Sequence, residues 1–444
     1  MRPVAVAIAA DPPLPGESTE EWAGLAEAAP GVDDGYLTLD AAVALARVRN
    51  PVLVGAEHDV EAARWSAVQA SRLPNPSVEV EAFPEHEVFE LEGGVEFALT
   101  DALLAPGRAR AFRSVAEAER HRAAEAGVRL TYDVRAAWYD AFAAEARLGV
   151  AQRALDALAA ARDVAEARVA SGNGPALEAA AHTAAYERTR GEVAALELGR
   201  EAARERLNAL LGLEGAETGW TLGGALPPLP DSVEVAEGAE KQALAASHAL
   251  AAARSRLDAL ARHGALARAE KGVPDVSVAL LGAWEGAPSF REEGEWRAGV
   301  GLHTTLPVFD GGRAEGRAWD ARFDGEAARA RGLVAETTSA VRSARARLVT
   351  AHARAVHERD VVLPAHRRLT RETLLHYNAM QRGVYELLQA RAAELAAELA
   401  HIETLRELGT AQAAWNALLA GARVEGGGDT GTIELGGASA GGGH

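Results

Sequence analysis

The chain contains the same pattern of segments twice. The first copy reads GVEFALT at residues 94–100, and the second reads GVGLHTT at residues 299–305. A Gly-containing turn and a long segment rich in Ala, Arg and Glu follow each stretch. The copies end in LNALLG at residues 207–212 and WNALLAG at residues 415–421. Internal repetition of this kind indicates a duplicated structural unit. The sequence therefore predicts one architecture, used twice.

Alternating segments in each copy predict β-hairpins. Residues 77–83 and 94–100 place Val, Phe or Leu on one face and mainly Ser, Glu or Thr on the other, and the second copy repeats the pattern. A period of two is typical of a strand with two different faces. We expect two hairpins, within residues 77–100 and 275–306, whose acidic loops include Glu90 and Glu285.

Long segments almost free of proline lie between the hairpins, at residues 108–170, 174–211, 313–380 and 384–419. A helix of about sixty residues extends roughly 90 Å, which suits a coiled coil or a tubular wall better than a compact domain. The predicted fold class is therefore mainly α with a small β part, as a duplicated unit of long coiled helices plus β-hairpins.

The expected domains follow from these patterns and from composition. They are a signal remnant with an extended linker at 1–35, a first repeat at 36–212, an inter-repeat linker at 213–235, a second repeat at 236–421 and a Gly-rich disordered tail at 422–444. The start, with Arg2 before a short apolar run, resembles the end of a secretory signal, short or truncated.

Composition narrows the function classes. The formal net charge is −18, which argues against nucleic acid as a partner. The sequence has no cysteine, so disulfides, thiolate metal sites and cysteine nucleophiles are excluded. It also shows no catalytic motif, no cofactor-binding motif and no metal-ligand spacing. We therefore predict a protein that is not an enzyme.

Five segments resemble the TolC-type outer-membrane efflux channels. They are residues 39–51, LPNPS at 73–77, LPVFDGGR at 306–313, residues 377–390 and the paired NALL endings. Their order and their duplication make the resemblance specific, and it covers residues 36–421. It implies a homotrimer in which each subunit gives four strands to one shared transmembrane β-barrel and long helices to an α-helical tube.

The resemblance also implies a function and a location. Such a channel sits in outer-membrane lipid, extends into the periplasm, and is a passive conduit that exports metal ions or small toxic compounds. A periplasmic adaptor, also called a membrane fusion protein, and an inner-membrane pump are the implied partners of this tripartite system. The motif YNAMQRG at residues 377–383 is most similar to the branch associated with heavy-metal resistance.

The family's periplasmic gate implies roles for three residues at the turns between helices. Tyr377 and Arg382 match the family's Tyr and Arg spacing, and Glu178 stands where an acidic partner is expected. The alternative is that Arg382 and Glu178 are solvated residues at the turns and pair with no other residue. Met380 replaces the usual glycine before the second turn, which predicts a less tightly bent tip.

Other residues have expected structural roles. A hinge where strand turns into helix is expected at Pro106, Gly107, Pro307, Gly311 and Gly312.

Three carboxylates, Glu79, Glu81 and Glu96, are expected to line the barrel lumen. There they would either favour cations or simply keep the lumen wet. A small antiparallel sheet with one solvated face accounts for the same alternation of residues equally well.

Two other protein classes remain open on sequence grounds. A periplasmic coiled-coil adaptor also carries a long helical hairpin, although it normally has one hairpin and a lipoyl-like β-domain, so the duplication argues against it. A soluble cytoplasmic coiled-coil scaffold gains support only from the weak resemblance of the N-terminus to a signal peptide.

Overall fold

The computed structural model describes residues 36–84, 89–223, 229–233, 237–286, 294–306 and 308–424. The expected signal remnant at 1–35 and most of the expected tail lie outside these residues. The chain forms two compact units. Unit 1 comprises Met1–Asp59, Leu130–Val233 and Leu348–Ala413, and unit 2 comprises Val60–Arg129, Glu234–Arg347 and Ala414–His444. Each unit therefore combines chain from both predicted repeats.

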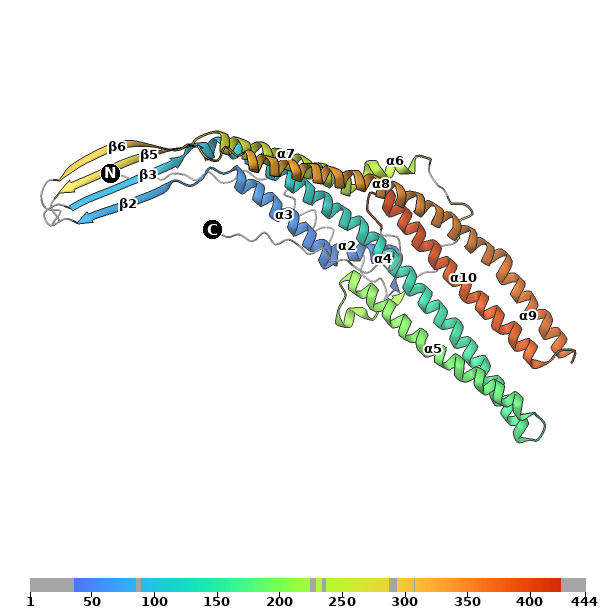
Figure 1. The fold of residues 1–444 in the computed structure, drawn as a ribbon. Helices are drawn as coiled ribbons and strands as arrows, with labels where there is room; N and C mark the ends of the chain where they lie inside the picture. The colour runs from blue at the N-terminus through green and yellow to red at the C-terminus, as the bar shows by residue number, and fades with distance from the viewer. Residues whose placement is uncertain are drawn as a thin grey trace. The chain divides into compact units, whose positions relative to one another are not determined.

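Unit 2 contains a four-stranded antiparallel sheet. Its strands are β2 (Ser77–Pro84), β3 (Phe89–Ala98), β5 (Asp275–Gly286) and β6 (Glu295–Thr305), in the order β2-β3-β5-β6 (Figure 1). The four predicted strands are confirmed. The pairing of β3 with β5, which joins the two hairpins into one sheet, was not predicted.

The strand limits differ from the prediction in two ways. Glu90 and Glu285 lie within β3 and β5 and not in loops, and they face each other across the sheet. Thr100 belongs to the helix that follows β3, where its hydroxyl accepts a hydrogen bond from the Val276 amide (2.8 Å) and donates one to the Pro274 carbonyl (3.1 Å). The start of that helix is thereby tied to the start of β5.

The rest of the described chain is mainly helical. Its helices are α2 (Leu39–Arg49), α3 (Pro51–Ser71), α4 (Leu99–Ala170), α5 (Ala176–Leu211), α6 (Ala239–Ala246), α7 (His248–Gly272), α8 (Arg313–His357), α9 (Leu363–Asn378) and α10 (Val384–Leu419). The predicted starts at Thr38, which caps α2, and at residue 384, where α10 begins, are confirmed.

The expected strand-to-helix hinge is wrong for one of its two sites. Pro106 and Gly107 lie inside α4, because the helix already begins at Leu99. Proline costs no hydrogen bond in the first turn of a helix, but Pro106 is the eighth residue of α4, so one backbone hydrogen bond is lost there. Gly311 and Gly312 do lie between β6 and α8, and Gly312 has a φ of 72°. Pro307 lies outside the described residues.

The segment predicted as one helix through residue 380 is interrupted. A π-helical turn, η3 (Glu358–Val362), separates α8 from α9, and the Leu363 amide reaches back five residues to the Glu358 carbonyl. Pro364 explains the interruption, because it has no amide hydrogen and its ring clashes with the carbonyl four residues earlier.

Each unit contains one close backbone contact between a glycine that follows a long helix and the break between two other helices. We call this contact a joint. In unit 1, the break between α2 and α3 lies against Gly212, and a Cβ added there would be 2.7 Å from the Arg49 carbonyl oxygen. In unit 2, the break between α6 and α7 lies against Gly421, with a corresponding distance of 2.0 Å to the Ala246 oxygen. Both glycines have positive φ, which favours a residue without a side chain.

The core of unit 1 surrounds its joint. Asn50 caps α3 through hydrogen bonds from the amides of Val52 (3.0 Å) and Leu53 (3.1 Å), and its own amide group donates to the Leu210 carbonyl (2.8 Å). Buried Trp138 donates to the Leu37 carbonyl (3.3 Å) in β1 (Tyr36–Leu37), which pairs in parallel with β4 (Thr221–Leu222). This small sheet was not predicted.

Candidate functional site

The sheet of unit 2 has two chemically different faces, and its register defines them. Glu79 lies opposite Gly94, Glu81 opposite Glu92, and Ser77 opposite Glu96, so the three predicted lumen carboxylates share one face. Further carboxylates lie on this face that the sequence pattern placed in loops or did not single out: Glu90, Glu92, Glu285 and Glu295. Knowledge of the strand limits would have identified them.

The polar face carries few groups that offset its negative charge. Arg297 pairs with Glu285 and lies 3.5 Å from Glu90. Ser277 donates a hydrogen bond to Glu96. Glu79 and Glu81 are exposed. This face is hydrated and strongly acidic, which suits contact with water and with cations.

The opposite face is apolar and exposed. Trp296, Val300 and Leu302 are 76%, 74% and 69% exposed, and they alternate along β6. Large exposed apolar surfaces of this kind mark a contact with another molecule or with lipid. The outer strands β2 and β6 each pair on one side only among the described residues, so both sheet edges are available for pairing.

Two helical hairpins in unit 1 end in turns of the same type. In the first, between α4 and α5, the amides of Gly172 and Asn173 bond to the carbonyls of Val169 (2.9 Å) and Arg168 (2.8 Å). This is the Schellman pattern, which places a left-handed residue after the helix, here Gly172 with a φ of 73°.

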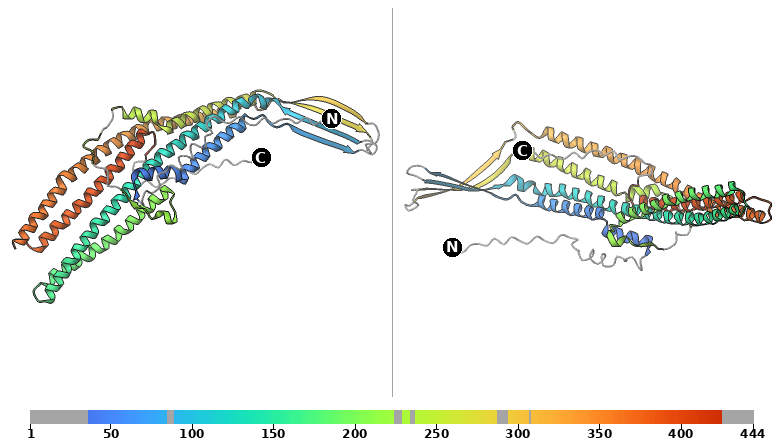
Figure 2. Two further views of the ribbon diagram at one scale, coloured as in Figure 1. Left: turned by 180° about the vertical axis from the view of Figure 1, so that it is seen from behind. Right: turned by 90° about the horizontal axis from the view of Figure 1, so that it is seen from below.

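The second turn, between α9 and α10, repeats that pattern with methionine in the glycine position. The amides of Met380 and Gln381 bond to the carbonyls of Tyr377 and His376, both at 2.9 Å. Met380 has a φ of 57° and is 95% exposed. The expectation of a looser bend is therefore wrong, because Met380 itself adopts the strained conformation. Helices α9 and α10 lie side by side in Figure 1 and in the left view of Figure 2.

The structure of the single chain does not bring the three expected gate residues together. Arg382 pairs with Glu386 at 2.6 Å, in the first turn of α10, and Glu386 also accepts the Gly383 amide. These contacts hold the pKa of Glu386 below its usual value. Glu178 pairs with Arg168 at 3.2 Å in the other hairpin, and Tyr377 is partly exposed.

The second hairpin also holds buried polar atoms that have no partner within the described chain. They are Glu358 Oε2 in the π-turn, His366 Nδ1 in α9 and His401 Nδ1 in α10. Burial lowers the pKa of His401; Glu358 opposes this shift, and Arg367 and Arg359 add to it. Burying these atoms without partners raises the free energy of the folded hairpin, and no sequence motif indicates them.

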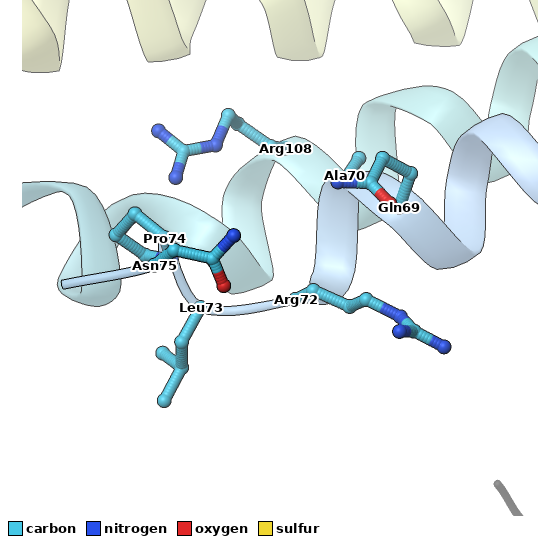
Figure 3. Close-up of a pocket in the computed structure, with 7 residues that line it drawn as sticks. All are labelled: Gln69, Ala70, Arg72, Leu73, Pro74, Asn75 and Arg108. Carbon is cyan, nitrogen blue, oxygen red and sulfur yellow. The ribbon is translucent and has the colours of Figure 1, made fainter. Parts of the chain in front are cut away.

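A small open pocket of about 340 Å³ lies where α3 ends before β2. It is lined by Gln69, Ala70, Arg72, Leu73, Pro74, Asn75 and Arg108. Figure 3 shows the guanidinium groups of Arg72 and Arg108 pointing away from one another, and Arg108 pairs with Asp101 at 2.8 Å. The two arginines therefore do not converge on a shared ligand.

Within the part of the chain that the structure describes, no three His, Asp or Glu side chains gather in a way that would hold a metal ion. No described helix combines the length and the apolar character needed to cross a membrane.

Comparison with solved structures identifies the fold. The outer-membrane channel OprN superposes with a TM-score of 0.72 at 20% identity, over 86% of this chain and 90% of that chain. CusC, described as forming a transmembrane channel, gives 0.72 at 17%, over 88% and 94%. The CmeC outer-membrane channel of Campylobacter jejuni gives 0.72 at 14%, over 86% and 85%. No protein-family model and no curated protein matches the sequence.

The chain therefore has the fold of outer-membrane channels of the TolC type, as the sequence resemblance predicted. The identities are low, so the likeness is one of architecture.

Proposed function

We propose that this protein is the outer-membrane channel of a tripartite efflux system and a member of the TolC-type family. The observation that carries the proposal is the sheet of unit 2. One of its faces is exposed and apolar, the other is acidic, and both edges are unpaired among the described residues. A single such sheet cannot sit in lipid, because bare edges are costly there.

Three copies resolve this problem. If three sheets join edge to edge, β6 of one subunit pairs with β2 of the next, and every edge is satisfied in one closed barrel. The exposed apolar face then contacts lipid, and the face with Glu79, Glu81 and Glu96 lines the lumen. The long hairpins form the helical tube, which a periplasmic adaptor and an inner-membrane pump would contact.

The acidic lumen favours positively charged or metal-ion cargo over anions of similar size. The assignment to heavy metals in particular rests on the motif at residues 377–383. Selectivity in such a system is expected to lie mainly with the pump, because a wide wet conduit makes few specific contacts.

The periplasmic mouth is proposed to close through its second hairpin. Tyr377 and Arg382 would bond to Glu178 of the same or a neighbouring subunit. Arg382 would then give up its ion pair with Glu386 for one with Glu178. The π-turn and the strained Met380 support movement in this hairpin, since such features often mark switching elements.

Fractionation tests the proposal. The full-length protein should appear in outer membranes, require detergent for extraction, and run as a trimer. Recovery from the periplasm as a soluble protein bound to a pump would favour the adaptor alternative, and recovery from the cytoplasm would favour the scaffold.

A further inference from the structure

The turn between α9 and α10 carries the only methionine among the residues that the structure describes. Met380 is 95% exposed, and its φ of 57° is one that glycine adopts without strain, as Gly172 does in the corresponding turn between α4 and α5. Packing does not account for such an exposed side chain, and the backbone geometry favours glycine. A strained residue that the fold does not need indicates a function of its side chain.

A histidine with a fixed ring lies close to Met380 in the chain. His376 is in the last turn of α9, where its carbonyl accepts the Gln381 amide (2.9 Å) and its Nδ1 lies 2.6 Å from Gln381 Oε1. An amide oxygen can only accept a hydrogen bond, so Nδ1 carries the hydrogen and donates it. The other ring nitrogen, Nε2, keeps its lone pair. Metal-ligating histidines have this arrangement, in which a neighbour holds the second nitrogen.

The imidazole and the thioether belong to the same turn. The amide of Met380 bonds to the Tyr377 carbonyl and that of Gln381 to the His376 carbonyl, so residues 376–381 fold back on themselves. The imidazole and the methionine side chain are both exposed. Methionine is unbranched and flexible, so its sulfur is free to swing towards the imidazole. One sulfur and one nitrogen can therefore bind the same ion at the end of this hairpin.

The two donor atoms select the class of ion. Thioether sulfur is a soft ligand that favours Cu(I), and imidazole also binds copper, whereas zinc sites are built from imidazole, thiolate and carboxylate. Cu(I) and its chemical analogue Ag(I) tolerate low coordination numbers, so a sulfur and a nitrogen can satisfy them. Zn(II) normally takes a fuller set of ligands. The site is therefore expected to prefer soft monovalent ions.

The charges around the turn allow a cation to approach. Arg382 lies two residues after Met380, and it pairs with Glu386 at 2.6 Å, so its positive charge is matched. The chain as a whole carries a formal net charge of −18. A negative protein attracts cations over a distance set by the ionic strength. The matched arginine therefore leaves the two donor atoms accessible to a metal ion.

We infer that His376 and Met380 form a binding site for a soft monovalent metal ion, Cu(I) or Ag(I), at the end of the second hairpin. The role of the site rests on the proposed channel function, because this turn then lies at the periplasmic mouth. A trimer would carry one site on each subunit around that mouth. The inference narrows the metal cargo of the channel to soft monovalent ions, which the site would bind on entry.

The composition allows a specific test, because the chain has two methionines and no cysteine. The full-length protein is labelled with carbon-13 in its methionine methyl groups, and Met380→Leu identifies the NMR signal of Met380. Ag(I) is titrated in chloride-free buffer as a probe that does not change its oxidation state there. We expect the Met380 methyl signal to shift with Ag(I) and to stay in place with Zn(II).

Variants of the turn test the two ligands and the residue that positions the imidazole. His376→Gln should weaken Ag(I) binding by at least about tenfold, because it removes one ligand. Gln381→Ala should weaken it by about tenfold, and Gln381→Glu should restore it, since a carboxylate also accepts the Nδ1 hydrogen. His357→Gln, at the exposed end of α8, is the matched control and should leave binding unchanged.

The outcomes separate the metal site from the channel. An unmoved Met380 signal in trimeric protein extracted from membranes would refute the metal site and leave the channel standing. A shift that His376→Gln does not weaken would refute the two-ligand site, and a shift that Zn(II) produces equally well would refute the preference for soft ions. Ag(I) binding by a protein that proves to be a soluble monomer would support the site and overturn the channel.

Discussion

The two repeats use the same joint between helices but build different hairpins. At Gly212 and at Gly421, the end of one helix packs against the backbone between two other helices, α2 and α3 in the first case and α6 and α7 in the second. The first hairpin has an uninterrupted α4 and a glycine at its turn. The second contains the π-turn at Glu358–Val362 and places Met380 in the glycine position. The joints are alike because a backbone contact leaves no room for a side chain.

The difference between the hairpins indicates which of them opens at the lower free-energy cost. A non-glycine residue with positive φ raises the energy of the resting state, and Met380 in the second hairpin is such a residue. Such energy is recovered when the element moves, so the second hairpin should open more easily than the first. The following changes test this comparison.

The joints should give the largest effect. Gly421→Ala places a Cβ 2.0 Å from the Ala246 carbonyl oxygen, and Gly212→Ala places one 2.7 Å from that of Arg49. We expect losses of about 3 kcal/mol or more for Gly421→Ala and somewhat less for Gly212→Ala in the free energy of unfolding, measured by denaturant titration in detergent. Gly215→Ala is the control, because Gly215 has a positive φ but open space, and should cost about 1 kcal/mol. Equal losses at all three positions would refute the proposed contact.

The turns should respond in opposite directions. Met380→Gly relieves a left-handed methionine and should stabilise the second hairpin by about 1 kcal/mol, whereas Gly172→Ala should destabilise the first by a similar amount. Hydrogen exchange of each hairpin measures both changes. Gly383→Ala has open space and no positive φ, so it controls for the loss of a glycine alone. A loss of protection in Met380→Gly would contradict the assigned strain.

Acidification should loosen the second hairpin. Burial lowers the pKa of His401 below its ordinary value of 6.5, so the unfolded chain binds the proton more readily than the folded one. Stability is therefore complete above about pH 6.5 and decreases as the pH falls through 6.5 towards the folded pKa. Hydrogen exchange in α10 at pH 7.5 and 5.5 should show this loss, and His401→Gln should reduce it. An unchanged pH response in that variant would place the effect elsewhere, with His248 and His263 as the next candidates, because burial lowers their pKa values too.

The smallest effect on stability is expected at the proposed gate. Arg382→Ala removes only an exposed pair with Glu386, and Tyr377→Phe removes only a hydroxyl, so unfolding should change by less than about 0.5 kcal/mol. Single-channel conductance should nevertheless rise in both variants if these residues hold the mouth closed. Arg168→Ala, which removes the pair of Glu178 in the other hairpin, is the matched comparison. Unchanged conductance in Arg382→Ala and Tyr377→Phe would contradict the proposed gate.

Much of the fold could be predicted from the sequence because its signals are local. The alternation along residues 77–83, the cap at Thr38 and the break at Asn50 each depend on neighbouring residues alone. The pairing of β3 with β5 could not be predicted from the sequence, since no residue near either strand specifies a partner strand from the other repeat.

Two predictions were wrong because the surrounding helices override the conformational preference of a single residue. Pro106 looked like a helix boundary, but a long helix tolerates one lost hydrogen bond near its start. Met380 looked incompatible with a tight turn, but the helices on both sides impose its conformation. For the candidate site, the register showed that Glu79, Glu81 and Glu96 share a face, whereas the partners of Arg382 and Glu178 depend on side-chain contacts that spacing alone does not determine.

The most direct test of the central claim is planar-bilayer recording on the purified full-length protein, with its mass in detergent measured in parallel. We predict a trimer that inserts and gives discrete conductance steps favouring cations over anions. A monomer that stays soluble without detergent and leaves the bilayer current unchanged would contradict the account.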